Sequence, residues 1–404
     1  DDTLRELIDK AYSTFRHDAI APLIQSGHNE FILELFQGPT LAFKDFALQF
    51  LGHLLDYVLK KRNQRVAIMG ATSGDTGSAA IEGCRHSDNV DIFILHPYQR
   101  VSEVQRRQMT TVLEDNVFNI ALEGNFDDCQ NMVKASFGDQ SFLPEGRQLV
   151  AVNSINWGRI LAQIVYYFKA YFAVTDSNEE TVSFSVPSGN FGNICAGHIA
   201  REMGLPIERL IVATNENDVL NDFFNQGAYQ PRTTDKTYVT SSPSMDISKA
   251  SNFERFVYLL LEKDSARVHK LFEGVKSGQG FDLSEVMEQV NNRYGFAAGK
   301  STHADRLHTI KEVYEQYGEL VDPHTADGIK VAKELQQQGE VIICAETALP
   351  VKFAETIIEA VGPIEIARPK HTEGLEDLEQ HVTVLDNKAE LVAEQIRQHV
   401  ASNG

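Results

Sequence analysis

The chain has 404 residues, of which 42% are hydrophobic and 23% are charged, and its formal net charge is −20. This balance is typical of globular proteins, and the length favours two domains over a single core. The negative charge opposes nucleic acid and anionic membranes as partners, and no run approaches the roughly 20 apolar residues of a membrane span, so we expect a cytoplasmic protein.

The four cysteines are scattered along the chain, without a Cys-x-x-Cys pair. This spacing supports neither a zinc site nor a disulfide framework, and we expect no metal. We interpret the cysteines as reduced thiols in the core. They are Cys84, Cys129, Cys195 and Cys344.

Strand and helix patterns alternate in the first half of the chain. The run RVAIMG has the composition of a buried strand, and it leads into a glycine-rich turn and a helix of small residues. The same alternation then occurs twice more. Three consecutive strand–helix units indicate a parallel sheet with helices on both faces. The expected strands are Arg65–Gly70, Asp91–Leu95 and Val117–Ala121, and the expected helices are Thr76–Cys84, Val101–Val112 and Phe126–Phe137.

The alternation resumes after a longer helix at Ile155–Ala173, in which apolar residues recur at helical spacing. Residues 226–248 are polar and have little periodicity, so we expect a long loop or a mobile flap there. Further strands are expected at Val182–Val186, Leu210–Thr214 and Val341–Ala345, and further helices at Ile194–Met203, at Asn217–Asn225 and from about Pro350 onward.

These elements predict an α/β protein with two bodies, each built on a parallel sheet. We expect a small domain at residues 56–153 and a large domain formed by residues 1–55 together with residues 154–404. The boundary is open, because the helix after residue 153 fits either body.

The turn PSGNFGN at Pro187–Asn193 lies between an expected strand and an expected helix. Its glycines let the backbone approach a ligand closely, and the amides and dipole of a helix start favour a phosphate. Ser188, Asn190 and Asn193 offer side-chain donors. Taken alone, the segment is equally compatible with an ordinary strand-to-helix turn.

A second turn, ATSGDTGS at Ala71–Ser78, also follows a strand directly. Its hydroxyls and amides could clasp a carboxylate, or it could be a plain helix start with Asp75 or Thr76 as the N-cap. The spacing fits neither a dinucleotide-binding fingerprint nor a Walker loop, which weakens NAD and ATP as ligands.

A lysine lies in the middle of the third segment of interest, QGPTLAFKDFALQF at Gln37–Phe50. We expect Lys44 on the first turns of an apolar helix, between Phe43 and Phe46. Such a lysine either extends its amine to solvent or is held in a site. Partial burial would lower its pKa, which a Schiff-base amine requires near neutral pH.

Together these segments resemble the threonine synthases, which belong to the fold type II pyridoxal-phosphate enzymes. The resemblance rests on five segments in the family's order, between about Phe31 and Phe353. It implies the fold of the tryptophan synthase β-subunit, with a cofactor-binding large domain and a mobile small domain. The segments are LELFQGPTLAFKDFALQ, ATSGDTGSAAI, NSINWGRILAQ, SVPSGNFGN and SPSMDI.

The resemblance also implies roles for individual residues. Lys44 would form a Schiff base with pyridoxal 5'-phosphate, and Asp75 would lie near the phenolic oxygen of the cofactor. The residues implied around the cofactor phosphate are Ser188, Gly189, Asn190, Phe191, Gly192 and Asn193. The residues implied in substrate binding are Thr72, Ser73, Gly74 and Thr76, near the carboxylate, together with Asn153, Ser154, Asn156 and Arg159.

The segment CAETALPVKF at Cys344–Phe353 resembles a family segment that usually reads G-T-A-H-P-A-K-F. Thr347 then corresponds to the hydroxyl that meets the pyridine nitrogen of the cofactor. Glu346 and Leu349 depart from the pattern, which puts in doubt any role of the usual histidine. For the substrate phosphate, Arg159 is the leading cation and Lys352 the second, although a salt bridge would equally explain Arg159.

The implied reaction converts O-phospho-L-homoserine and water to L-threonine and phosphate. One alternative is a threonine synthase-like phospho-lyase that releases 2-oxobutyrate, and another is a non-catalytic relative that acts as a binding protein. We expect a monomer or a homodimer. The family's usual N-terminal segment is expected to be absent before Asp1–Ile24.

Overall fold

The structure is a computed structural model that describes residues 2–402. The chain divides into two compact units. Unit 1 comprises residues 2–18, 38–158 and 367–402, and unit 2 comprises residues 19–37 and 159–366. The sequence predicts residues 1–55 in the larger body, whereas this division places only residues 19–37 of that stretch in unit 2.

Local packing explains why helix α2 (Asp45–Arg62) groups with unit 1. A Cβ added to Gly52 of α2 would lie 1.8 Å from the carbonyl oxygen of Gly83 in α3 (Asp75–Cys84), so two glycines let these helices touch backbone to backbone. Helix α1 (Asp2–Tyr12) is tied to α2 in turn, because the Tyr12 hydroxyl donates to the Phe46 carbonyl at 3.0 Å.

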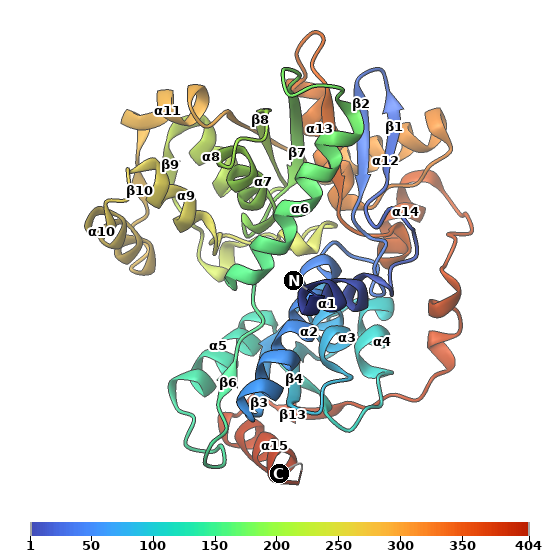
Figure 1. Cartoon of the computed structure of the whole chain (residues 1–404), viewed down its shortest axis with the longest axis vertical. Coiled ribbons are helices and arrows are strands. Elements are labelled where there is room, and N and C mark those ends of the chain that lie inside the picture. Colours follow the sequence, from blue (N-terminus) through green and yellow to red (C-terminus); the bar gives the residue numbers. More distant parts are fainter. Residues whose placement is uncertain (1, 403–404) are drawn as a thin grey trace. The chain divides into compact units, whose positions relative to one another are not determined.

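Unit 1 contains a five-stranded parallel sheet of order β13-β5-β4-β3-β6. Figure 1 labels β3, β4, β6 and β13 among these strands. All eight residues of β4 are buried, as expected for a central strand that is covered on both faces. The strands are β3 (Val66–Ala71), β4 (Val90–Pro97), β5 (Val117–Glu123), β6 (Leu149–Val150) and β13 (Thr383–Asp386).

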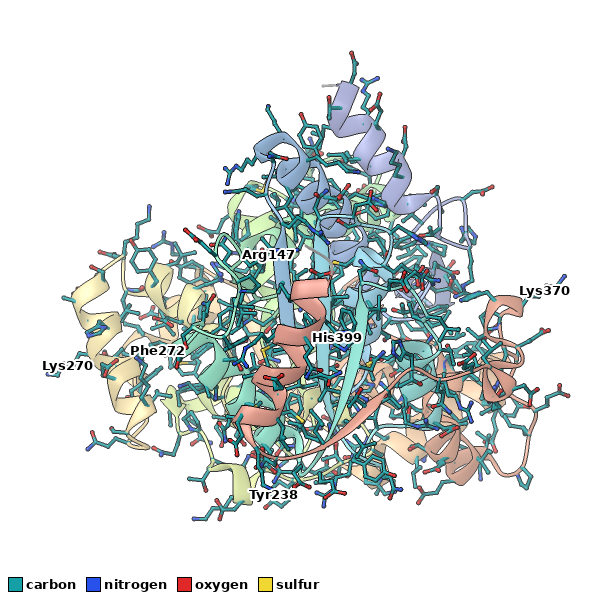
Figure 2. The ribbon with its side chains drawn as sticks, turned by 90° about the horizontal axis from the view of Figure 1, so that it is seen from below. Arg147, Tyr238, Lys270, Phe272, Lys370 and His399 are labelled. Carbon is teal, nitrogen blue, oxygen red and sulfur yellow. The ribbon has the colours of Figure 1, made fainter. Side chains whose placement is uncertain are left out.

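Helices cover both faces of this sheet through two separate apolar clusters. One cluster joins the strands to α2, α3 and α4 (Glu103–Thr110), and the other joins them to α5 (Phe126–Gly138) and α15 (Ala389–Ser402). Figure 2 labels His399 of α15, whose ring stacks on Phe118 of β5 with the centroids 4.2 Å apart. The chain's C-terminal segment is therefore part of the core of unit 1.

Unit 2 contains a six-stranded sheet of order β1-β2-β12-β7-β8-β11, in which only the β1–β2 hairpin is antiparallel. A two-stranded pair, β9 with β10, lies apart from it. The strands are β1 (Leu23–Gly27), β2 (Glu30–Glu34), β7 (Val182–Pro187), β8 (Ile207–Thr214), β9 (Ala228–Tyr229), β10 (Phe281–Asp282), β11 (Phe296–Lys300) and β12 (Ile342–Glu346).

Successive residues of β7 show that both faces of this sheet are covered too. The Phe184 ring meets the Tyr167 ring of α6 with the centroids 4.8 Å apart, while the Ser185 hydroxyl donates to the Gly328 carbonyl of α13 at 2.7 Å. Neighbouring side chains on a strand point to opposite faces. The helices of unit 2 are α6 (Trp157–Val174), whose first two residues belong to unit 1, α7 (Gly192–Glu202), α8 (Val219–Gln226), α9 (Phe253–Leu260), α10 (Ser265–Lys276), α11 (Met287–Asn292), α12 (His303–Tyr317), α13 (Pro323–Leu335) and α14 (Ala354–Val361).

The expected α/β class with two parallel-sheet bodies is confirmed. Residues 226–248 are mostly irregular, as expected, with β9 and two short 3₁₀ turns, Thr234–Lys236 and Pro243–Met245. The four cysteines are buried. Within residues 2–402, no helix is both long and apolar enough to span a bilayer.

Candidate functional site

Lys44 lies immediately before α2, not on its first turns as expected. Leu41 has a left-handed backbone with φ 64°, which interrupts the helix upstream. The buried Asp45 carboxylate then holds the preceding turn, since it accepts the Thr40 amide at 2.8 Å and the Thr40 hydroxyl at 2.7 Å. Lys44 therefore follows a turn that is fixed by hydrogen bonds, and its side chain is only 12% exposed.

The Lys44 amine faces a buried carboxylate in the second glycine-rich turn. Its Nζ lies 3.3 Å from Oδ2 of Asp75, whose side chain is 3% exposed. The other oxygen, Oδ1, accepts a hydrogen bond of 2.8 Å from Nε2 of Gln105 on α4. Gln105 is itself 3% exposed and accepts from the Ser102 hydroxyl at 3.0 Å. The three side chains Lys44, Asp75 and Gln105 form what we call the lysine cluster.

The turn at residues 71–78 is shaped by Thr72. Its hydroxyl oxygen accepts the amides of Gly74 and Gly77, each at 2.9 Å, so these two amides are used within the loop. Gly74 occupies the N-cap position of α3 with φ 144°, a backbone that favours glycine. Of the remaining predicted carboxylate-binding residues, Ser73 is exposed and Thr76 is half-buried.

The turn at residues 187–193 leads from β7 into α7, as expected. Phe191 is the N-cap residue with a left-handed backbone, φ 61°. Its ring is 1% exposed and packs in the core against Phe224, Phe253, Phe256 and Phe296, at centroid distances of 5.5 to 6.0 Å. Phe191 can therefore serve a ligand only through its backbone.

Asn193 provides the strongest structural sign of a ligand in this turn. Its Oδ1 accepts hydrogen bonds from the hydroxyls of Tyr166 at 2.6 Å and Tyr167 at 2.8 Å. Its Nδ2 is buried and has no partner among the residues that the structure describes. A buried donor without a partner costs roughly 1–3 kcal/mol, and an anion bound at this helix start would satisfy it. The turn therefore fits a phosphate.

The other residues of the turn differ in what they can offer. The Ser188 amide donates to the Ala213 carbonyl at 2.9 Å and its hydroxyl to the Val186 carbonyl at 3.0 Å, so both groups are already used. Asn190 Oδ1 accepts from the Ser251 hydroxyl at 3.1 Å, which orients the side-chain amide. A Cβ at Gly192 would lie 3.3 Å from Nδ2 of Asn252.

Thr347 follows β12 directly and is 6% exposed. Its amide donates to the Thr325 hydroxyl oxygen at 3.3 Å, and its own hydroxyl has no partner in the described part of the chain. The neighbouring Glu346 is buried, and burial raises the pKa of this carboxyl well above its usual range, aided by Asp322 and Glu34. Burial therefore disfavours a negative charge on Glu346 beside Thr347.

The two cations predicted to bind the substrate phosphate are both buried in unit 2. Arg159 is 4% exposed, and burial lowers the pKa of its guanidinium to about 10, so it stays charged near neutral pH. Lys352 is 2% exposed and lies in the 3₁₀ turn Pro350–Phe353. In unit 1, Asn153 and Asn156 shape a turn through their side-chain oxygens, which accept the amides of Ile155 at 3.3 Å and Gly158 at 2.9 Å.

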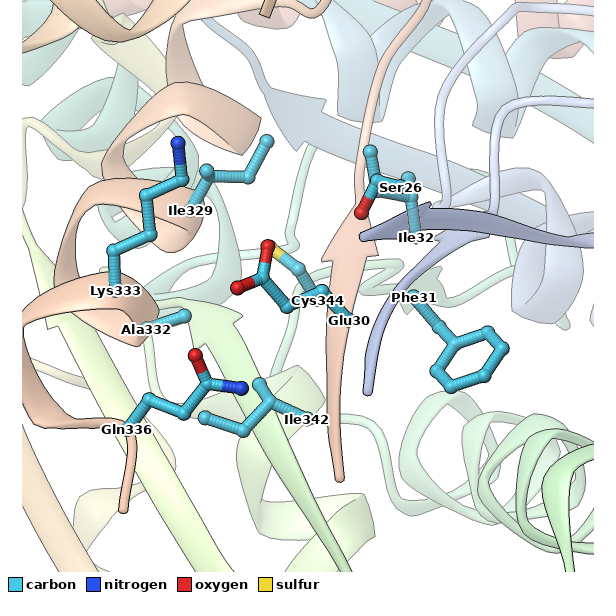
Figure 3. Close-up of a pocket in the computed structure, with 10 residues that line it drawn as sticks. All are labelled: Ser26, Glu30, Phe31, Ile32, Ile329, Ala332, Lys333, Gln336, Ile342 and Cys344. Atoms are coloured by element: carbon cyan, nitrogen blue, oxygen red, sulfur yellow. The ribbon is translucent and has the colours of Figure 1, made fainter. Parts of the chain in front are cut away.

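A small, mostly apolar pocket in unit 2 is not this site. It lies among β2, β12 and α13, where Ile32, Ile329 and Cys344 line it (Figure 3). Of the described residues in its lining, none belongs to the predicted site.

Sequence reasoning missed Gln105 and the two tyrosines that orient Asn193. A signal for Gln105 exists, because it lies four residues before the buried Met109 and so on the inward face of α4. Tyr166 and Tyr167 gave no such signal, because tyrosines on the apolar face of a helix are normally interpreted as core packing residues.

Comparison with known proteins identifies the family. Residues 21–344 match a model described as pyridoxal-phosphate dependent enzyme, and residues 325–396 match one described as threonine synthase, C-terminal. A threonine synthase from Methylobacillus glycogenes is 50% identical over 410 residues, covering 99% of this chain and 86% of the relative. One from Pseudomonas aeruginosa is 52% identical, covering 99% of this chain and 84% of the relative.

A solved structure agrees with these relatives. The chain superimposes on the PLP-bound threonine synthase from Brucella melitensis with a TM-score of 0.93 and 47% identity, covering 99% of this chain and 84% of the other. The chain belongs to the threonine synthase family of fold type II enzymes, which depend on pyridoxal phosphate.

Proposed function

We propose that this enzyme converts O-phospho-L-homoserine and water to L-threonine and inorganic phosphate. The family assignment supports this reaction. Among the structural observations, the one that carries it is the mostly buried Lys44 amine at 3.3 Å from Asp75. An amine in this setting can hold an aldehyde cofactor and exchange protons with a bound substrate.

Bound pyridoxal phosphate supplies an electron sink for negative charge that develops on the substrate carbon atoms. Lys44 would hold the cofactor, and its amine is the group that would move protons at Cα and Cβ of the substrate. Asp75 keeps the amine oriented through the contact at 3.3 Å. Gln105 fixes the carboxylate by its bond to Oδ1.

The turn at residues 187–193 binds the cofactor phosphate in this proposal. Asn193 donates through Nδ2, which is aimed by the two tyrosine hydroxyls on Oδ1. The backbone of Gly189 through Gly192 supplies amides, and Asn190 supplies its side-chain nitrogen. The Ser188 hydroxyl contributes only if its bond to Val186 is exchanged for one to the phosphate. Thr347 would meet the ring nitrogen with a neutral hydroxyl, which cannot stabilise a protonated ring as a carboxylate would.

The proposed contacts to the substrate match the negative charges of its carboxylate and its phosphate. Ser73 and Thr76 bind the carboxylate near the start of α3, while Thr72 holds that loop in shape. The Gly74 amide contributes only if its bond to the Thr72 hydroxyl is exchanged for one to the substrate. Arg159 is the first candidate to bind the substrate phosphate, because its guanidinium can donate to two phosphate oxygens at once. Lys352 is the second candidate. Asn153, Ser154 and Asn156 complete the substrate contacts.

Product analysis tests this function. Purified protein with pyridoxal phosphate and O-phospho-L-homoserine is expected to release phosphate and L-threonine in equal amounts. Release of 2-oxobutyrate in place of threonine would instead assign the phospho-lyase reaction. Failure to bind the cofactor at all would favour a non-catalytic binding protein.

A further inference from the structure

A buried hydrogen-bond network begins at the N-cap of α13. Asp322 accepts the His324 amide at 2.9 Å and contacts the His324 ring Nδ1 at 2.7 Å, both through Oδ1. Its Oδ2 accepts the amide of Thr325 at 3.3 Å and also the Thr325 hydroxyl. Asp322, His324 and Thr325 are at most 2% exposed, so this cap is a rigid part of the core.

The partners of His324 determine its tautomer. Because Nδ1 faces a carboxylate that accepts, Nδ1 carries the proton and Nε2 has a free lone pair. Nε2 accepts the backbone amide of Ser244 at 3.0 Å. A protonated ring would place one N–H against another there, so the neutral imidazole is the form that makes this contact.

Ser244 belongs to the 3₁₀ turn Pro243–Met245, which abuts the proposed phosphate turn. A Cβ on Gly189 would lie 2.9 Å from Cα of Met245 and 3.3 Å from the Ser244 carbonyl oxygen. The backbones of the two turns are therefore in direct contact. Whatever fixes Ser244 also limits how far Gly189 can move.

The same cap reaches a second segment of the proposed site. The amide of Thr347, the residue proposed to meet the cofactor ring, donates to the Thr325 hydroxyl oxygen at 3.3 Å. Asp322 thus braces Thr347 through Thr325, and Gly189 through His324 and Ser244. Two elements that are far apart in the sequence share one anchor.

We propose that His324 is a positioning residue for the cofactor: as a hydrogen-bond acceptor for the Ser244 amide, it holds the residue 243–245 turn against the phosphate-binding turn. This inference rests on the proposed role of residues 187–193. Without the acceptor, a partly buried amide loses its partner, the turn relaxes, and Gly189 is no longer fixed. Cofactor affinity falls as a result, while the fold is retained.

Two substitutions separate the two ring nitrogens. His324→Gln places an oxygen near the position of Nε2 and keeps the acceptor for Ser244, whereas His324→Asn keeps a donor for Asp322 and loses that acceptor. Cofactor-free protein is titrated with pyridoxal phosphate. We expect the dissociation constant to rise roughly tenfold for His324→Asn and to stay within about threefold of wild type for His324→Gln. At saturating cofactor, kcat of both variants should approach that of wild type.

The stability control is Ile357→Val, which removes one methyl group from a fully buried apolar position of unit 2 and changes none of the hydrogen-bonding groups of the network. It should lower the melting temperature without changing cofactor affinity. Unchanged affinity in His324→Asn, or equal losses in both His324 variants, would overturn the inference. If wild type itself bound no cofactor, the proposed function would fail and the inference with it.

Hydrogen exchange gives a second test that needs no variant. In wild-type protein without cofactor, the amide of Ser244 should exchange slowly, because it is bonded to His324 Nε2. Exchange at the rate of an unfolded chain would overturn the proposal even if His324→Asn failed to fold.

Discussion

Lys44 and Asp75 meet at 3.3 Å, although one lies before α2 and the other in the first turn of α3. Each is held by its own support. The Asp45 carboxylate braces the turn before Lys44, and Gln105 donates to Oδ1 of Asp75. The distance between the amine and the carboxylate is thus set by three elements of unit 1, and it can be perturbed without touching either group.

Replacement of Gln105 by leucine should impair catalysis. Asp75 would lose its bond to Nε2 and could turn away from the Lys44 amine. We expect kcat to fall roughly tenfold, which corresponds to about 1.4 kcal/mol in the activation free energy. The dependence of kcat on pH should change as well. Steady-state kinetics across pH measure this. Glu103→Gln, at a 53% exposed side chain of the same helix, is the control and should have little effect. Equal kinetics in Gln105→Leu and wild type would contradict the role of Gln105.

Substitution of Asn193 by aspartate should weaken cofactor binding strongly. The buried Nδ2 donor would become an oxygen facing the cofactor phosphate, so that attraction is replaced by repulsion. We expect the dissociation constant for pyridoxal phosphate to rise about 100-fold, measured by titration of cofactor-free protein. Tyr171→Phe removes another buried tyrosine hydroxyl of α6, bonded to the Ser177 and Glu180 carbonyls, and should leave the affinity unchanged. An Asn193→Asp protein that binds the cofactor normally would exclude this turn as the phosphate site.

An alanine at Gly189 should destabilise unit 2. Its Cβ would lie 2.9 Å from Cα of Met245, and backbone atoms cannot yield as a flexible side chain can. We expect a loss of about 1–3 kcal/mol in the free energy of unfolding together with weaker cofactor binding. Gly138→Ala is the matched control, because its Cβ would meet nothing within 4 Å. Urea unfolding compares the two, and similar stabilities would refute the steric argument.

His198 should make the protein sensitive to acid. Burial lowers the pKa of His198 to about 4, from 6.5, with the Arg201 charge acting in the same direction. Its ring is packed against Phe256 and Tyr294, at centroid distances of 5.2 and 5.4 Å. Because the folded-state pKa is the lower one, the unfolded chain binds more protons between pH 4 and pH 6.5, and stability falls as the pH drops through this range.

Comparison with a His198→Leu variant isolates this contribution. Between pH 7 and pH 5, wild type should lose roughly 2 kcal/mol more of its free energy of unfolding than the variant does. Urea unfolding at both pH values provides the measurement. A variant that loses stability with acid as steeply as wild type would assign the sensitivity to other groups.

The strand–helix units between residues 65 and 137 were predictable because their signals are local. The expected strand at Asp91–Leu95 lies within the observed β4, Val90–Pro97, and the expected helix at Thr76–Cys84 differs from α3 by one residue. A continuous apolar run followed by a glycine-rich turn indicates a buried parallel strand without any tertiary information. The order of the strands in the sheet is not visible in this way.

Other features depend on contacts between distant residues. Thr383 of β13 pairs with Ile120 of β5, and the short β13 has no fully buried residue to mark it as a strand. The sequence predicts the start of α2 too early. Leu41 has a left-handed backbone, but this conformation is usually signalled by a glycine or an asparagine, and leucine gives no such signal. In the candidate site, the lysine and the glycine-rich turns could be read from motifs, whereas the partners that aim them, Gln105 and Tyr166, could not.

Reduction of the cofactor-bound protein with borohydride, followed by peptide mass spectrometry, tests the central claim most directly. The account predicts one pyridoxyl adduct, on Lys44, and no adduct in a Lys44→Ala variant, which should also lose turnover. An adduct on a different lysine, or turnover retained by Lys44→Ala, would contradict it.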